Sequence, residues 1–207
     1  PEAILWLHTD PNGFDGMNKL LTGTTTEYLP LANGTTTGYL DLTAVDSQAK
    51  ALAFLVHLDG WLGLLDGPPD ALYMPRKAKA LLKNVASLAG QYTLEKDTIG
   101  RPYEAYNGIP LVDPGAKAGS NTDVLGLATR DTDAGGAGSN ITGLADIYAV
   151  RFALDGVHAM STTGSLVRNW MPDFSTAGAV KTGEAEMGPV AVVVKKTKSA
   201  GVLRNLK

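Results

Sequence analysis

The sequence contains no cysteine, and only three histidines occur among its 207 residues. The absence of cysteine excludes a disulfide framework, a thiolate metal site and a cysteine nucleophile. A zinc site needs about three or four protein ligands, and His8, His57 and His158 lie far apart in the sequence. Only His8 and Asp10 have the spacing of a ligand pair, which we interpret as part of a solvated turn. We therefore expect no metal site and no cofactor.

Charge is also scarce. Charged residues make up 19% of the chain, the net charge is -3 and the pI is about 5.6, a balance that disfavours tight, sequence-specific binding of nucleic acid. The longest nearly apolar run, Ala49–Leu65, is interrupted by Lys50 and Asp59 and does not fit a membrane span. No secretory signal opens the sequence, and we expect no membrane partner.

Known catalytic motifs are missing as well. Gly164-Ser165-Leu166 lacks the second glycine of a nucleophile elbow and is interpreted as a hairpin turn. The cluster Gly135–Asn140 lacks the Gly-Lys-Ser/Thr ending of a phosphate-binding loop and is interpreted as a flexible loop. Two carboxylate pairs lie in polar sequence that predicts solvated side chains, Asp131 with Asp133 and Glu184 with Glu186. The sequence thus predicts no catalytic residue and no enzyme.

What is present is a globular composition with many turns. Hydrophobic residues make up 44% of the chain, enough for one core, while 24 glycines and 11 prolines indicate many turns and long loops. A long helix is predicted over Ser47–Leu65, capped by Asp46 or Ser47, and another from Pro75 to its terminator Gly90. Short helices are expected over residues 2–8 and 14–21.

Strands are expected between and after these helices. Asn33-Gly34 predicts a small hairpin within Thr22–Thr43. The loop 113–143, with a possible strand at 124–127, is expected to be functional or mobile. Asp155-Gly156 is predicted to turn the strand 145–154 into an antiparallel partner at 157–160. The remaining strands are expected at residues 71–74, within 91–112, near 166–170 and at 190–194.

Several segments together resemble the major capsid protein of tailed bacteriophages, the Hong Kong 97-like fold family that also includes encapsulin shells. Their order along the chain, more than any one segment, makes the resemblance specific. The matching segments are Phe14-Asp15-Gly16-Met17, Pro69–Arg76, Gly100-Arg101-Pro102-Tyr103 with Tyr106–Leu111, Asp146–Phe152, and Val190–Val194 with Leu203.

The resemblance implies an α+β Hong Kong 97-like subunit with an axial lobe over residues 44–154 and a peripheral lobe made of residues 1–43 and 155–207. It implies a structural role, self-assembly into pentamers and hexamers that enclose a DNA genome in the virion, after assembly in the host cytoplasm. Scaffold, portal and decoration proteins are implied as further partners, and packaged DNA as a non-specific one. The family's N-terminal arm and extended loop are expected to be missing or shortened, since the sequence begins at Pro1 and about 45 residues precede the first long helix.

Candidate assembly contacts follow from composition and from this resemblance. We expect the loop 113–143 to reach toward the axis of a capsomer and the basic C-terminal segment to lie at a subunit boundary, where unlike charges pair. The named candidates are Asp131, Asp133, Lys195, Lys196, Lys198 and Arg204. Deleting Asp131–Gly138 is expected to spare the monomer and to impair assembly. A second basic group, Arg76, Lys77, Lys79 and Lys83, is interpreted as a solvated helix face, with nucleic acid or a partner subunit as the alternatives.

Two other functions remain open at this stage. One is an encapsulin-like nanocompartment shell, which shares the fold and encloses a different cargo. The other is a small hydrolase or sugar-binding module, favoured slightly by the Thr/Gly hairpins and by exposed tyrosine and tryptophan. Loss of an activity on His8→Ala or His158→Ala would favour this last function.

Overall fold

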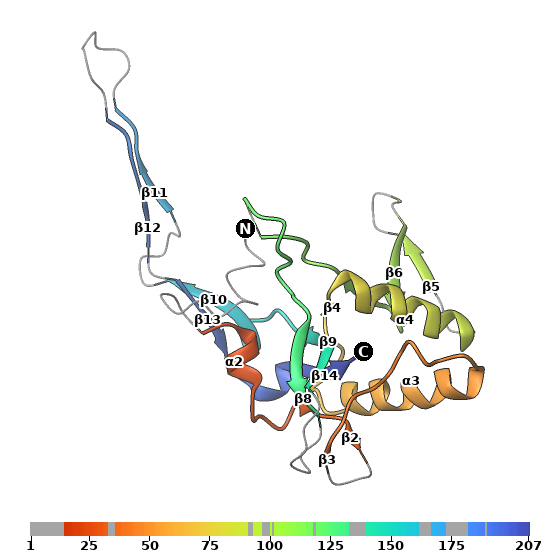
Figure 1. Cartoon of the computed structure of the whole chain (residues 1–207). Coiled ribbons are helices and arrows are strands. Elements are labelled where there is room, and N and C mark those ends of the chain that lie inside the picture. The colour runs from red at the N-terminus through yellow and green to blue at the C-terminus, as the bar shows by residue number, and fades with distance from the viewer. Residues whose placement is uncertain are drawn as a thin grey trace.

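The fold was analysed in a computed structural model of the chain (Figure 1). The structure describes residues 15–32, 36–90, 93–96, 100, 102–117, 119–132, 140–161, 167–172, 182–188 and 190–207. The expected helix at 2–8, His8, residues 135–139 of the glycine cluster and Gly164-Ser165-Leu166 lie outside these residues. Within them, helices and a large sheet are combined, which confirms the predicted α+β class.

The centre of the molecule is an eight-stranded mixed sheet with the order β1-β14-β9-β4-β7-β6-β5. The eighth strand, β8, pairs with the first half of β9. β14 is antiparallel to β9 and parallel to β1, and β4 is parallel to β7. The strands are β1 (Glu27–Tyr28), β4 (Ala71–Tyr73), β5 (Thr93–Lys96), β6 (Pro102–Tyr106), β7 (Ile109–Val112), β8 (Ala128–Asp131), β9 (Asn140–Val150) and β14 (Ala200–Leu206).

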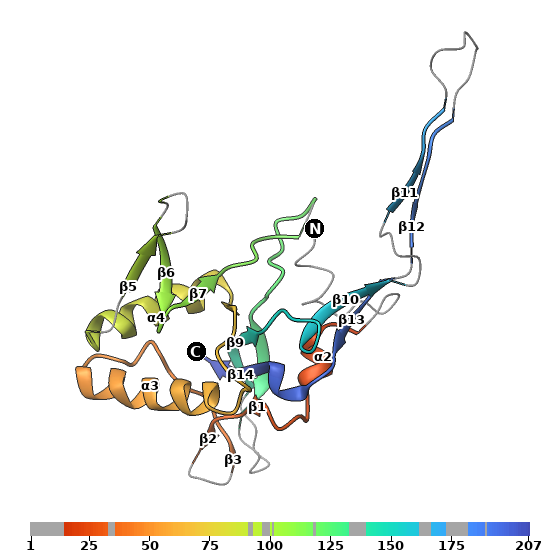
Figure 2. The same ribbon diagram turned by 180° about the vertical axis from the view of Figure 1, so that it is seen from behind.

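Two long helices lie side by side on one face of the sheet (Figures 1 and 2). α3 (Gln48–Leu62) and α4 (Arg76–Leu88) correspond to the two helices predicted from hydrophobic spacing. Pro75 lies at the N-cap of α4, one residue before the first helical position expected for it. Gly90, at φ 73°, adopts the left-handed conformation typical of a residue just past a helix end.

The sheet separates two hydrophobic cores because side chains of a strand point alternately to its two faces. Ile147 and Ala149 of β9 pack with α3 and α4 in the larger core. Tyr148 and Val150 pack instead in a second core. That core also contains Met17 and Leu21 of α2 (Met17–Leu21), together with Val124, Leu125, Val157, Ala200 and Val202. Both faces of the central strands are therefore buried.

A long two-stranded ribbon leaves the body on the side away from α3 and α4 (Figures 1 and 2). At its base β10 (Val157–Ser161) pairs with β13 (Val190–Val194). Farther out β11 (Val167–Trp170) pairs with β12 (Glu184–Met187). Strands were predicted at these places, but the predicted pairing of the strand 145–154 with 157–160 is wrong. β9 ends at Val150, where β14 and β4 pair with its two edges, and β10 pairs with β13 instead.

The predicted loop 113–143 is also partly structured. β8 and the first residues of β9 form an antiparallel pair within it, and Asp131 lies opposite Asn140. The possible strand at 124–127 is absent: Val124 and Leu125 are buried in the second core without strand structure. The predicted hairpin at Asn33-Gly34 is present as β2 (Leu31–Ala32) paired with β3 (Thr36–Thr37). None of the helices in the described ranges is long and apolar enough for a membrane span.

Candidate assembly surface

The described residues do not converge on a catalytic or metal centre. No group of three or more His, Asp or Glu side chains in these ranges could hold a metal ion. His57 lies on α3, with its Nδ1 2.7 Å from the Tyr28 hydroxyl, and His158 lies on β10. The two side chains thus belong to different parts of the molecule and do not act on one site.

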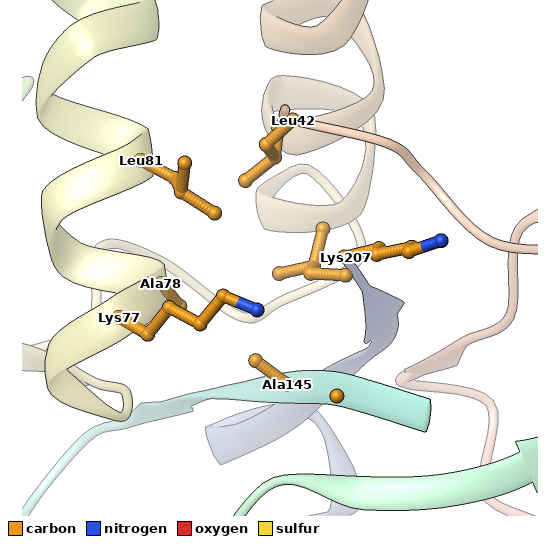
Figure 3. A pocket seen from close by; sticks show the side chains of 8 residues that line it. Leu42, Lys77, Ala78, Leu81, Ala145 and Lys207 are labelled. Carbon is orange, nitrogen blue, oxygen red and sulfur yellow. The ribbon is translucent and has the colours of Figure 1, made fainter. Parts of the chain in front are cut away.

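One crevice lies between α4 and the carboxyl end of β14 (Figure 3). Leu42, Leu81 and Ala145 line it, and the side chain of Lys77 extends across it from α4. The crevice has no space for a water-sized sphere, so the apolar side chains around it belong to the packed core. It does not have the size of a ligand pocket, which typically holds several hundred Å³.

A larger hollow lies on the outer surface beside α4, with a volume of about 450 Å³. Arg76, Lys79, Ala80 and Lys83 of the helix line it, with Glu104 of β6 and Asp113 beyond β7. Lys83 Nζ donates a hydrogen bond of 2.9 Å to Glu104, and Lys79 Nζ lies 3.4 Å from the same carboxylate. These interactions, the Lys83 hydrogen bond above all, lower the pKa of Glu104.

The balance of charge at this hollow is positive. α4 contains four cationic residues and no acidic one, and Glu104 partners two of the four. Arg76 is exposed, and it makes no hydrogen bond or ion pair with another residue that the structure describes. The guanidinium of Arg76 is thus available to an anionic or aromatic group from outside the chain.

The outer ribbon is exposed on both strands. All four residues of β11 are exposed, and the side chains of Trp170 and Met171 keep 50% and 78% of their accessible surface. The strand register places Arg168 opposite Glu186 and Trp170 opposite Glu184. Directly paired residues lie on the same face of an antiparallel ribbon. One face therefore combines a tryptophan, an arginine and two carboxylates.

Large apolar side chains continue along the base of the ribbon. Phe152, Leu154 and Met160 are exposed, and Leu154 keeps 81% of its accessible surface. With Val167, Trp170 and Met171, six of the most exposed large hydrophobic residues fall within one segment of twenty residues, 152–171. Scattered exposed apolar residues are ordinary, whereas a concentration of them marks a surface that another molecule covers.

The outer face of α3 is the second apolar surface. Leu52 and Val56 are exposed on it, and Ala49, Ala53 and Gly60 extend the same stripe at helical spacing. The inner face of the helix packs into the core through Phe54, Leu55, Leu58 and Trp61. A helix that is apolar on both sides is typically buried on both sides. The outer stripe therefore has the composition of an interface.

The exposed lysines among the predicted contacts lie at the base of the ribbon. Lys195, Lys196 and Lys198 follow β13 and are all exposed. Lys196 Nζ lies 3.2 Å from Asp155 and 3.6 Å from Asp66, and its hydrogen bond is the main reason that the pKa of Asp155 is lowered. Asp131 is exposed at the end of β8, and Asp133 lies outside the described residues.

Arg204 occupies a different environment from the one expected for a subunit boundary. Its side chain is buried between β14, β1 and β9, where it forms ion pairs with Glu27 and Asp146. It also donates hydrogen bonds to Asn18 at 2.8 Å and to Thr22 at 2.9 Å. A guanidinium with these partners cannot also bind a neighbouring subunit. The basic tail pattern was misleading because Arg204 lies in a central strand, and a buried charge needs partners within the fold.

The sequence analysis did not identify the ribbon face or the α3 stripe. Trp170 lies at the end of a predicted strand and Met171 follows it, while Leu154 ends another predicted strand, and this pattern does not reveal exposure. Burial depends on whether another strand pairs beside β11, and β11 and β12 form a sheet of only two strands. For α3 a signal was available: Ala49, Leu52, Ala53 and Val56 form a second apolar stripe beside the inner one.

Comparison with known proteins found similar chains among the solved structures. No protein-family model matches the sequence, and no curated protein matches it. A solved structure of the holo-SrpI encapsulin complex from Synechococcus elongatus PCC 7942 aligns over 72% of this chain at 16% sequence identity, with a TM-score of 0.48. The alignment covers 48% of that chain, so this chain corresponds to about half of its length. The functional argument below rests on the surfaces described above.

Proposed function

We propose that the protein is a structural subunit that associates with copies of itself to form a closed shell. The observation that carries this proposal is the projecting ribbon with its exposed apolar side chains, Leu154, Trp170 and Met171 among them. An isolated two-stranded ribbon is marginal in water, and unpaired strand edges invite association. A shell subunit exposes such elements because neighbouring subunits cover them, in interfaces that are large and largely apolar.

In its specific form, the proposal is a bacteriophage capsid subunit of the Hong Kong 97-like type, with an axial lobe at 44–154 and a peripheral lobe at 1–43 and 155–207. It forms pentamers and hexamers that enclose DNA, is assembled in the host cytoplasm, and works with scaffold, portal and decoration proteins. The sequence resemblance supports this form. The subunit has a structural and not an enzymatic role.

The alternative is an encapsulin-like shell that encloses protein cargo. Both forms share self-association, and they differ in what the particle contains. The alternative therefore predicts the same fast-sedimenting particles without nucleic acid, and with a second protein inside them.

Sedimentation velocity of the purified chain, with negative-stain images of each fast-moving fraction, tests the proposal. Rings or closed shells are the expected result. A strict monomer up to several hundred micromolar, in this chain and in a longer one that extends beyond Pro1, contradicts it. Particles from the native source then distinguish the two forms: nuclease-protected DNA supports the capsid, and a co-purifying protein within DNA-free particles supports the compartment.

A further inference from the structure

The face of the outer ribbon that contains Trp170 has the chemistry of a binding site for a guanidinium group. Trp170 and Glu184 are directly opposite each other across the two strands. Glu186 lies two residues farther along the same face, opposite Arg168, so Glu184 is the carboxylate that has no cation directly across from it. An aromatic ring attracts a cation over its face, and a carboxylate accepts two parallel hydrogen bonds from arginine. Arginine uses both interactions more effectively than lysine does, because its guanidinium is planar.

The complementary group lies on the same chain, at the hollow beside α4. Arg76 is exposed at the first position of the helix and lines this hollow together with Ala80 and Lys83. Lys79 and Lys83 already share the carboxylate of Glu104, whereas Arg76 has no partner in the described part of the chain. The hollow, which Glu104 and Asp113 also line, thus combines an arginine that makes no ion pair with a described residue and a volume of about 450 Å³.

The two surfaces cannot meet within one molecule. The ribbon projects from the side of the sheet opposite to α3 and α4, and both views of the fold show its outer strands pointing away from these helices (Figures 1 and 2). A contact between them therefore joins two copies of the chain. Because it uses different surfaces on the two copies, it is heterologous, and such contacts generate rings when the rotation between copies closes.

We propose that the Trp170 face of the ribbon docks on the α4 hollow of a second copy, with Arg76 of that copy held between Trp170 and Glu184. This inference rests on the proposed function, and it names the contact through which the subunits bind one another. β12 contributes two glutamates to the ribbon face, and α4 contains no acidic residue. This charge complementarity indicates that a second copy of the chain occupies the hollow. The outer stripe of α3, which is apolar and offers no cation matched to Glu184, is the competing docking site.

A charge swap tests the contact in the full chain. Glu184→Arg and Arg76→Glu are each expected to weaken association at least tenfold, and the double variant is expected to restore most of it, because the pair is reformed with the signs exchanged. Both positions are exposed, and a glutamate at the start of a helix is favourable, so the variants are expected to fold. Lys96→Glu, a charge reversal at an exposed position of β5 outside both surfaces, is the matched control and is expected to leave association unchanged.

Sedimentation velocity over a concentration series distinguishes the outcomes. Loss in each single variant with recovery in the double variant supports the contact. Association of both single variants at the wild-type level overturns the contact and leaves the proposed function standing. If Val56→Glu loses association while Glu184→Arg and Arg76→Glu keep it, the interface lies on α3 and the proposed contact is overturned. A wild-type chain that remains monomeric throughout overturns the proposed function itself, and the contact with it.

Disulfide trapping gives an independent measurement, because the chain has no cysteine of its own. Ala80→Cys, in the hollow, is mixed with Glu186→Cys, on the ribbon face, under mild oxidation. The contact predicts a mixed disulfide between the two preparations and little dimer in either one alone. Equal dimer formation within one preparation indicates an isologous interface and contradicts the proposal.

Discussion

Arg204 in β14 and Glu27 in β1 form an ion pair across 177 residues of sequence, and both side chains are almost completely buried. Asp146 of β9 lies on the other side of the same guanidinium at 3.1 Å. Arg130 of β8 donates two further hydrogen bonds of 2.6 Å to Asp146, so that two arginines and two carboxylates join four strands. The cluster links α2 and β1 to the centre of the sheet.

The first prediction concerns this cluster. Arg204→Met leaves Glu27 and Asp146 buried with one fewer cation, and we expect the free energy of unfolding to fall by about 3–5 kcal/mol. Lys195→Met, at an exposed lysine nine residues earlier, is expected to change the free energy of unfolding by about 0.5 kcal/mol or less. Equilibrium denaturation measures both. Equal effects in the two variants would contradict the role assigned to Arg204.

The second prediction separates the two faces of α3. Leu58 is fully buried on the inner face, so Leu58→Ala is expected to cost about 2–5 kcal/mol. Val56 keeps 69% of its accessible surface on the outer stripe, and Val56→Ala is expected to cost about 0.5 kcal/mol or less in the monomer. Thermal unfolding of the dilute protein compares them, and a large loss in Val56→Ala would place that residue in the core.

The third prediction concerns Gly156, at the turn that leads into the ribbon. A Cβ atom at this position would lie 2.8 Å from the backbone oxygen of Arg151 and 3.3 Å from the Cβ of Ser199. Gly156→Ala is therefore expected to destabilise the protein by about 1–3 kcal/mol, because backbone must shift. Gly126→Ala, where no atom lies within 4 Å, is the control and is expected to be neutral. Chemical denaturation that found both variants neutral would show that this turn can relax.

The fourth prediction is a dependence of stability on pH. The pKa of Glu104 is lowered, mainly by the hydrogen bond from Lys83. Because the unfolded carboxyl has its ordinary, higher pKa, this interaction stabilises the fold above that value, and the stabilisation is lost as the pH falls through the folded pKa. Glu104→Gln is expected to reduce stability at pH 7 and to flatten its decline between pH 5 and pH 3. Urea denaturation at a series of pH values measures the slope, and an unchanged slope would contradict the assignment.

Much of the fold could be predicted because its signals are local. α3 and α4 have apolar residues at helical spacing and are followed by Gly63 and Gly90, and β13 is rich in valine. The pairing of the strands was less predictable, because it depends on which edges remain free. β10 follows a tight turn after β9, yet β14, fifty residues farther along the chain, takes the place beside β9.

The candidate surface was predictable only in part. The lysines after β13 are exposed and stay candidate contacts, whereas Arg204 is buried, because strands distant in sequence cover it. The exposure of Trp170 could not be predicted from local sequence either. A strand of this composition is buried in a larger sheet and exposed in a two-stranded ribbon, and local sequence does not distinguish the two.

The position of β14 also determines when the protein can fold. β14 lies between β1 and β9, and it is the last strand in the sequence. On a ribosome, β9 would be complete long before its neighbour emerged, with one hydrogen-bonding edge and both apolar faces incompletely covered. The sheet then forms by a late, long-range step, so we expect slow folding for a chain of this size.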